Sequence, residues 1–247
     1  MKLALITDLH ANREAVEAVL EHAALQGVDR YALLGDFVGY GADPGWVVDQ
    51  VRTLVKAGAI AVMGNHDAAV FGSLRDSMVP QAREAVLWTR ENLSVEQKAF
   101  LGALPMSVTE ADSLFVHASA DAPTQWRYVQ NRIDAVDSLQ ATDRRHTFCG
   151  HVHEPRLYHL TDGGDAGEIQ PVPGVAMSLS PQCRWLAIVG SAGQPRDGNP
   201  AACYATFDTD DATLTSHRVP YDHLAAAAKI IAAGLPASLA ARLVRGT

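Results

Sequence analysis

The sequence predicts an α/β fold in which two packed, mixed β-sheets form a β-sandwich flanked by helices. Short apolar runs at residues 2–7, 30–34 and 59–63 alternate with segments of helical periodicity. This β-α-β-α-β order predicts a parallel sheet with right-handed crossovers. Beyond Pro105 the pattern changes to a series of short strands, which we assign to the rest of the two sheets. Hydrophobic residues make up 48% of the chain and charged residues 19%, which is an ordinary globular balance.

Helices are expected between and after the first three strands. Apolar residues recur at helical spacing over residues 11–26, and Gly27 is placed to end that helix. Residues 46–56 read as a second helix, and residues 67–104 look helical. Within the last region, Ser94-Val95-Glu96-Gln97 resembles a capping box that begins its final helix.

The second half of the chain reads mainly as strands followed by a helical tail. One helix is expected at about 132–141, and the tail at about 222–247 divides into helices at 222–234 and 236–245. Strands are expected at 106–110, 113–117, 146–149, 156–160, 184–189, 202–208 and 213–219. No repeat or linker divides the chain, so a single domain over residues 1–247 is predicted. The alanines of the tail indicate a packing helix, with a homo-oligomer interface as the alternative.

Charge and cysteine content narrow the class of protein. The formal net charge of −8 argues against a dedicated nucleic-acid binder or a nuclease, which normally show a basic surface. The three cysteines, Cys149, Cys183 and Cys203, are widely spaced and do not predict a disulfide framework. The first residues lack the apolar length of a signal peptide, and no apolar run approaches a membrane span. We therefore expect a soluble, cytoplasmic protein.

Polar motifs follow several of the predicted strands. Ligands of open α/β sheets bind beyond the carboxyl ends of strands, where these side chains would meet. The motifs are Asp8-Leu9-His10, Gly35-Asp36, Gly64-Asn65-His66-Asp67, His117 and Gly150-His151-Val152-His153. They supply seven candidate metal ligands: Asp8, His10, Asp36, Asn65, His117, His151 and His153. This number exceeds what one ion needs and fits two divalent ions that share the carboxylate of Asp36.

The ligand chemistry points to a class of metal. Mixed nitrogen and oxygen donors without thiolates suit Mn²⁺ first, with Fe, Zn²⁺, Co²⁺, Ni²⁺ and Mg²⁺ as alternatives. Each motif alone is weak evidence, because polar residues after strands often only cap a helix or form a turn. Their occurrence as an ordered set is what predicts the site. The remaining histidines, His22, His146, His159, His217 and His223, lack such motifs and are interpreted as surface or edge residues.

The motifs resemble those of the calcineurin-like metallophosphoesterase superfamily, whose pattern runs D-x-H, G-D, G-N-H-[DE], H and G-H-x-H. All of these elements occur here in the same order, between residues 8 and 153. Residues 35–41 and 190–198 resemble the compact bacterial and archaeal phosphodiesterase branch. Gly39-Tyr40-Gly41 stands where the Ser/Thr protein phosphatases carry a D-R-G segment, which counts against that branch.

The resemblance implies a role for each candidate residue. One metal takes Asp8, His10, Asp36 and His153, and the other takes Asp36, Asn65, His117 and His151. A metal-bridging hydroxide is the nucleophile. The resemblance makes His66 the residue that protonates the leaving oxygen or stabilises charge, and Asp67 the residue that orients His66.

The implied activity is phosphodiester hydrolysis on a small phosphate ester. Phosphomonoesterase, phosphoprotein phosphatase and dinucleoside polyphosphate hydrolase share the same metal chemistry and stay open as alternatives. A non-catalytic protein-binding scaffold is disfavoured because His66 and all seven ligands are present. As a further hypothesis, Tyr40, Trp126, Arg127 and Tyr128 line the substrate pocket, although a loop anchored by buried aromatic residues is an equal reading. Arg196 is interpreted as structural rather than catalytic.

Overall fold

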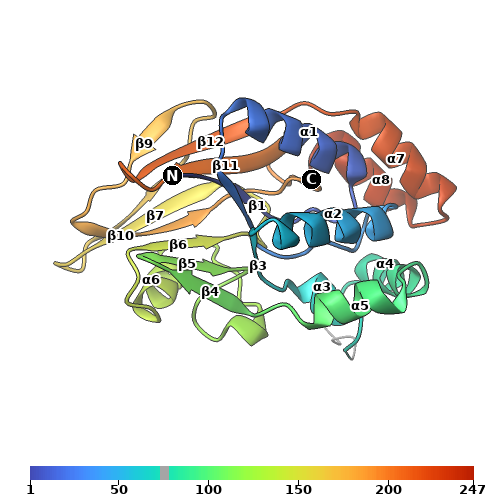
Figure 1. The fold of residues 1–247 in the computed structure, drawn as a ribbon, viewed down its shortest axis with the longest axis horizontal. Coiled ribbons are helices and arrows are strands. Elements are labelled where there is room, and N and C mark those ends of the chain that lie inside the picture. Colours follow the sequence, from blue (N-terminus) through green and yellow to red (C-terminus); the bar gives the residue numbers. More distant parts are fainter. Residues whose placement is uncertain (73–77) are drawn as a thin grey trace.

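Two six-stranded mixed sheets face each other in the computed structural model, which describes residues 1–72 and 78–247 (Figure 1). Across the first sheet the order is β3 (Ile60–Ala61), β2 (Arg30–Leu33), β1 (Lys2–Ile6), β11 (Ala202–Asp208), β12 (Thr213–Val219) and β9 (Ala176–Ser178). Across the second it is β4 (Ser107–Glu110), β5 (Ser113–Val116), β6 (His146–Cys149), β10 (Cys183–Ile188), β7 (Arg156–Thr161) and β8 (Ala166–Ile169). The predicted fold class is confirmed.

The first three strands are parallel and are joined by helices, as the sequence predicts. Strand β1 pairs with β2, and β2 with β3, all in the parallel sense. The connections are α1 (Arg13–Leu25) and α2 (Pro44–Lys56). The side chain of Asn12 accepts a hydrogen bond from the Ala15 amide at 3.2 Å and so caps the start of α1. This parallel order brings the carboxyl ends of the three strands to one edge of the sheet.

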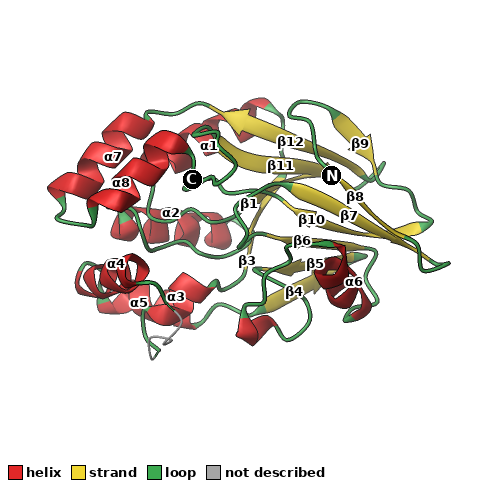
Figure 2. Cartoon of the chain, turned by 180° about the vertical axis from the view of Figure 1, so that it is seen from behind, coloured by secondary structure: helices red, strands yellow, loops and turns green. Residues whose placement is uncertain are grey.

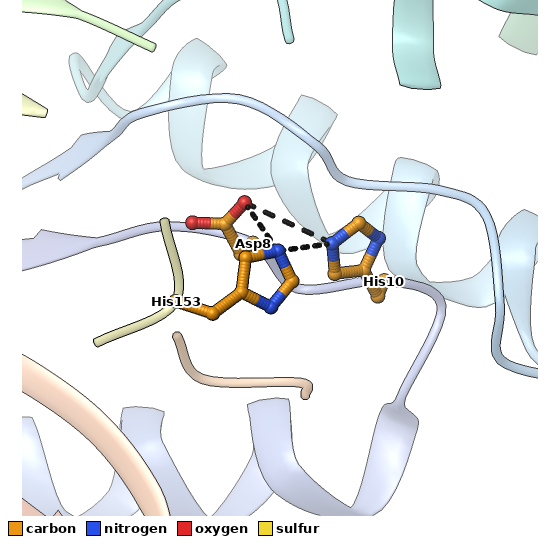
Figure 3. Close-up of side chains that lie close together, drawn as sticks. All are labelled: Asp8, His10 and His153. Carbon is orange, nitrogen blue, oxygen red and sulfur yellow. Dashed lines mark hydrogen bonds and ion pairs between the residues drawn. The ribbon is translucent and has the colours of Figure 1, made fainter. Parts of the chain in front are cut away.

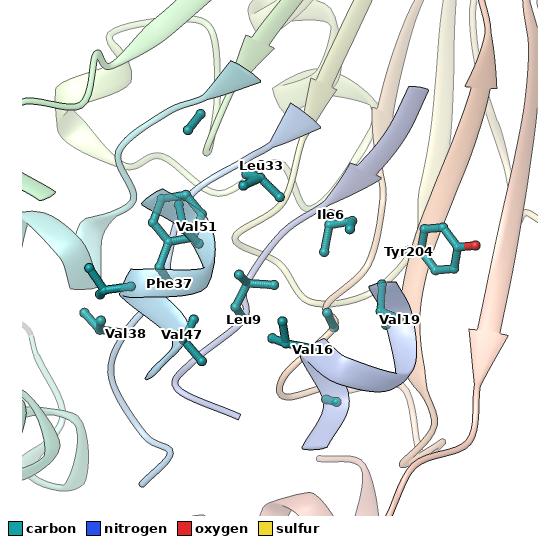
Figure 4. Packing of buried hydrophobic residues seen from close by; sticks show 14 of the residues in the cluster. Ile6, Leu9, Val16, Val19, Leu33, Phe37, Val38, Val47, Val51 and Tyr204 are labelled. Atoms are coloured by element: carbon teal, nitrogen blue, oxygen red, sulfur yellow. The ribbon is translucent and has the colours of Figure 1, made fainter. Parts of the chain in front are cut away.

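The alternation of side chains along β1 explains how both faces of the sheet are covered. Leu3 and Leu5 point between the two sheets, where they join residues of both sheets in one core. Ala4 and Ile6 point to the other face and pack with the apolar sides of α1 and α2 (Figure 4). Burying one leucine in this way contributes roughly 1.5–3 kcal/mol. Strand β1, which leads to Asp8 and His10, is therefore packed against apolar residues on both faces.

The described residues of the region predicted as helical, 67–104, include three helices. They are α3 (Asn65–Ala69), α4 (Pro80–Glu91) and α5 (Val95–Gly102). Residues 73–77 lie outside the described residues. The predicted capping box of α5 is confirmed, because Ser94 and Gln97 exchange side-chain to backbone hydrogen bonds.

The helical tail forms α7 (His223–Ala232) and α8 (Ala237–Arg245), which lie together at one end of the molecule (Figure 2). Ala226 and Ala227 are buried in a cluster with alanines of α4 and with Tyr40. Lys229 Nζ pairs with Glu14 at 2.5 Å and with Asp43 at 2.9 Å. The predicted packing role of this tail is confirmed, and it places α7 beside the loop that follows β2.

Some sequence-based expectations differ from the structure. The helix expected at about 132–141 is present as α6 (Arg132–Gln140). The short strands β8 and β9, in contrast, were not predicted. His146 and His217 are buried rather than on the surface, packed against Phe207 and Tyr204 respectively. Among the described residues, no helix combines the length and apolar character needed to cross a bilayer.

Candidate functional site

The predicted ligands meet where strands of both sheets end. Asp8 and His10 follow β1, Asp36 follows β2, and Asn65 begins α3, four residues after Ala61 ends β3. In the second sheet, His117 follows β5, and His151 and His153 follow β6. Backbone hydrogen bonds join the loops within each sheet, from Asp8 N to Gly35 O at 3.0 Å and from Gly150 N to His117 O at 2.9 Å. All seven predicted ligands therefore converge where strands of the two sheets end.

Asp8, His10 and His153 form a first buried group (Figure 3). Asp8 Oδ2 accepts hydrogen bonds from the Thr7 hydroxyl at 2.9 Å and from the His151 amide at 3.0 Å. Asp8 Oδ1 has no hydrogen-bond partner in the described part of the chain. It lies 3.2 Å from His153 Nε2 and 3.7 Å from His10 Nε2. One carboxylate oxygen is thus free to face the two imidazoles.

The backbone fixes which nitrogen of each imidazole faces this point. His10 Nδ1 lies 3.1 Å from the carbonyl of Val38, and His153 Nδ1 lies 2.6 Å from the carbonyl of Gln194. A carbonyl accepts only, so each Nδ1 carries the proton and each Nε2 presents a lone pair. The two Nε2 atoms are nevertheless 3.2 Å apart. Two lone pairs and a bare carboxylate oxygen at this spacing are the donor set of a cation.

Asp36, His117 and His151 form a second buried group, with Asn65 beside it. His117 Nδ1 lies 2.8 Å from Leu34 O, and His151 Nε2 lies 3.1 Å from Trp126 O. By the same reasoning, His117 Nε2 and His151 Nδ1 turn toward each other, 3.2 Å apart. Asn65 Oδ1 is 3.1 Å from His117 Nε2, and Asp36 Oδ2 is 3.4 Å from it. Four acceptor atoms surround one position.

Asp36 belongs to both halves of the site. Its Oδ1 accepts a hydrogen bond from the His66 amide at 2.8 Å. Its Oδ2 lies 3.4 Å from His117 Nε2 and 3.8 Å from His10 Nε2. The carboxylate therefore stands between a ligand of the first group and a ligand of the second, which is the position that a shared ligand requires.

The pKa shifts of the buried side chains indicate that the site favours a positive charge. Burial disfavours an ionised carboxylate, but the surrounding imidazoles outweigh it and lower the pKa of Asp36. Burial also disfavours charge on His117, but Asp36 and Asp8 raise its pKa to about 9. Burial and the neighbouring His117 lower the pKa of His151 to about 3. A cation that binds among these acceptors must therefore compete with a proton on His117.

Backbone strain is concentrated at the same residues. Of the eleven non-glycine residues with positive φ in the described chain, five are predicted ligands: Asp8, His10, Asp36, His151 and His153. Such conformations cost L-residues free energy and persist where the surroundings enforce them. Gly150 is required for a different reason, since a Cβ there would collide with Thr7 and Asp8. The strained backbone conformations turn the side chains of these predicted ligands toward one another.

Asp67 does not contact the imidazole that it was expected to orient. Its Oδ2 accepts hydrogen bonds from the amides of Asp36 and Gly64, both at 2.9 Å. Its Oδ1 accepts from Phe37 N at 2.9 Å and Val38 N at 3.3 Å. Asp67 therefore shapes the loop that carries Asp36. The hydrogen-bond partner of His66 is instead Tyr40, whose hydroxyl lies 3.0 Å from His66 Nε2.

An open cavity of about 360 Å³ adjoins the site. Its walls include Tyr40, His66, Trp126, Tyr128 and His151. The ring of Tyr128 stacks on that of His151, with centroids 4.0 Å apart. Three of the four residues proposed for the substrate pocket thus surround this cavity.

The charged residue nearest the aromatic walls differs from the expected one. Arg127 is exposed, forms an ion pair with Asp121, and is not among the residues that line the cavity. Arg196 does not line the cavity either, but it lies behind the Tyr40 wall, with its Cζ over the Tyr40 ring at 5.8 Å from the centroid. The sequence signal for this placement was the glycine-rich segment 190–198, in which Arg196 was interpreted as structural.

Comparison with known proteins agrees with this geometry. Residues 1–212 match the calcineurin-like phosphoesterase superfamily domain. A metallophosphoesterase from Sphaerobacter thermophilus is 39% identical, with a TM-score of 0.88 over 100% of this chain and 99% of that one. An uncharacterised protein of Methanocaldococcus jannaschii is 34% identical over 250 residues, 99% of this chain and 98% of that protein. A hypothetical protein of Pyrococcus horikoshii OT3 shares the fold at 17% identity, with a TM-score of 0.81 and coverage of 100% and 98%. The two high-identity matches and the domain match show that the chain belongs to the calcineurin-like phosphoesterase superfamily.

Proposed function

We propose that the protein hydrolyses phosphodiesters at a dinuclear metal centre. The observation that carries this proposal is the convergence of buried acceptor atoms in two groups on either side of Asp36. The donors are imidazole nitrogens, carboxylate oxygens and one amide oxygen, a set that suits Mn²⁺ and related divalent ions. The first ion would be held by Asp8, His10, Asp36 and His153, and the second by Asp36, Asn65, His117 and His151.

The bound ions would supply a nucleophilic hydroxide at neutral pH and neutralise charge on the phosphate. The protein's own residues then have three tasks. Asp8, Asp36 and the histidines hold the ions in a water-poor setting, since these side chains are almost fully buried. His66 lines the cavity and faces the substrate's leaving oxygen. Tyr40, Trp126 and Tyr128 form the walls against which the organic part of the ester packs.

The shape of the cavity favours a diester over a monoester. At about 360 Å³ it has room for far more than a phosphate group, and it opens beside the metal ligand His151. The aromatic walls formed by Tyr40 and Tyr128 can contact the second organic group of a diester, which a monoester lacks. The 39% identical Sphaerobacter thermophilus protein, described as a metallophosphoesterase, supports the reaction class but does not choose between the two esters.

A substrate panel tests the proposal. The protein is loaded with Mn²⁺ and assayed with bis-p-nitrophenyl phosphate, p-nitrophenyl phosphate and diadenosine tetraphosphate, and its metal content is measured. We expect the highest kcat/KM with the diester and none with an Asp36→Asn variant. A higher kcat/KM with the monoester or the dinucleotide would replace the diester assignment. No turnover by fully loaded protein on any ester would refute the enzymatic function.

A further inference from the structure

The imidazole of His66 is oriented by a residue that is not one of the proposed metal ligands. His66 is fixed at its backbone, because its amide donates to Asp36 Oδ1 at 2.8 Å. Its ring has one hydrogen bond in the described structure, between Nε2 and the hydroxyl of Tyr40 at 3.0 Å. Nδ1 is buried and has no partner among residues 1–72 and 78–247. No described carboxylate contacts either ring nitrogen through a hydrogen bond, so the orientation of the imidazole depends on Tyr40.

The loop around Tyr40 is built to make this contact. Tyr40 has a φ of +65°, a conformation that L-residues with large side chains rarely adopt. Gly39 precedes it, and a Cβ at that position would lie 2.5 Å from His66 Nδ1. The loop therefore approaches the imidazole as closely as backbone allows. Glycine would adopt this backbone conformation without strain, so any advantage of tyrosine at position 40 comes from its side chain.

The Tyr40 ring is enclosed on several sides. It packs against His66 with ring centroids 4.5 Å apart and against the ligand His10 at 4.6 Å. Helices α4, α7 and α8 contribute the apolar cluster behind it. The Cζ of Arg196 lies over the ring, 5.8 Å from its centroid, as in a cation–π contact. Arg196 itself is held by Gln194 Oε1 at 3.1 Å, while its buried Nε has no partner in the described chain.

We propose that Tyr40 is the positioning residue of His66, and that Arg196, which lies over the Tyr40 ring, keeps that ring in place. This inference rests on the proposed function, because it assigns how His66 is aimed at the leaving oxygen. A hydroxyl takes the place that a carboxylate commonly has beside a working histidine. Tyr40 lines the cavity together with His66 and is not one of the proposed metal ligands, so a change there affects the leaving-group step more than metal binding.

The test compares Tyr40→Phe with Tyr158→Phe in the Mn²⁺-loaded enzyme. Tyr158 is a matched control, because it is buried and its hydroxyl has no hydrogen-bond partner in the described residues. We expect Tyr40→Phe to keep two metal ions per chain and KM within about twofold, and to lower kcat by about fivefold to tenfold, the equivalent of one hydrogen bond. The loss is larger for a diphenyl than for a bis-p-nitrophenyl diester, because a poorer leaving group depends more on His66. Tyr158→Phe stays within twofold of wild type.

A double-mutant cycle separates positioning from packing. If Tyr40 acts through His66, adding Tyr40→Phe to His66→Asn lowers kcat by less than twofold. Arg196→Met is expected to lower kcat in the same direction as Tyr40→Phe, with metal content unchanged. Wild-type kcat in Tyr40→Phe, or a full further loss in the His66→Asn background, would overturn the inference while leaving the proposed function standing. Absence of turnover by the loaded wild-type protein would instead refute the proposed function.

Discussion

Replacing Asp36 by asparagine is expected to remove most of the stability that divalent cations give to the protein. The substitution keeps the size of the side chain and an acceptor for the His66 amide, which donates to Oδ1 at 2.8 Å. It removes the charge between the two groups, where Oδ2 lies 3.4 Å from His117 and 3.8 Å from His10. Under the proposed arrangement, both ions would lose the negative charge of their shared ligand through one change.

The size of the effect follows from linkage. With Mn²⁺ at about 100 times Kd, each wild-type site adds about 2.7 kcal/mol, so two sites raise Tm by about 11–22 °C. A weakening of about 100-fold at each site leaves about 0.4 kcal/mol per site, and the rise in Tm falls to about 2–3 °C. His153→Gln, which disturbs only the first group, keeps about half of the wild-type rise.

Thermal unfolding with and without Mn²⁺, combined with metal analysis, checks these values. The three proteins should rank wild type, His153→Gln and Asp36→Asn in the metal-dependent rise of Tm. If Asp36→Asn kept the full rise, or lost no more than His153→Gln, Asp36 would not be shared by two ions and the reasoning would fail.

Three further outcomes are expected. His66→Asn keeps both ions and lowers kcat by about 10²–10⁴-fold, as loss of an acid-base group does; loss of metal as complete as in Asp36→Asn would contradict this role. In the metal-free protein His117 has a pKa of about 9, because Asp36 and Asp8 outweigh burial, so it is charged at neutral pH and a metal must displace its proton. Apparent Mn²⁺ affinity, measured by calorimetry, should therefore rise with pH by up to about tenfold per unit toward pH 9, and a pH-independent affinity would refute it. Gly39 has a φ of +87°, and a Cβ there would lie 2.5 Å from His66 Nδ1. Gly39→Ala should therefore reduce kcat and lower the free energy of unfolding, measured in urea, by about 2–4 kcal/mol. Wild-type values of both would contradict the packing described.

The sequence predicted the fold where local patterns and long-range packing agree. Strand β1 reads as a strand because Leu3 to Ile6 are all apolar, and it is buried on both faces as such runs are. Strands β8 and β9 escaped prediction because residues 166–169 and 176–178 are half-exposed and short, so no apolar pattern marks them. They exist because neighbouring strands offer an edge on which to pair.

The candidate site was predictable to the extent that motifs at strand ends must converge. Asp8 and Asp36 meet because β1 and β2 are parallel neighbours, and His117 and His151 meet because β5 and β6 are parallel neighbours in the other sheet. The atoms that orient these ligands were out of reach, because they are backbone carbonyls such as Leu34 O and Trp126 O. A carbonyl is present at every position and leaves no signal in the sequence.

The misassigned partners have a similar cause. Asp67 stands next to His66 in the chain, yet its carboxylate turns back to the amides of the Asp36 loop. Arg127 is close to the predicted ligand loops in sequence and is exposed, whereas Arg196, distant in sequence, lies over the Tyr40 ring. Proximity in sequence guided both expectations, and the tertiary fold decided otherwise.

A crystal grown with Mn²⁺ and measured near the manganese absorption edge would show whether two cations sit on either side of Asp36. We expect two anomalous peaks, one beside Asp8, His10 and His153 and one beside Asn65, His117 and His151, with Asp36 in contact with both. A single peak, or peaks remote from Asp36, would contradict this arrangement.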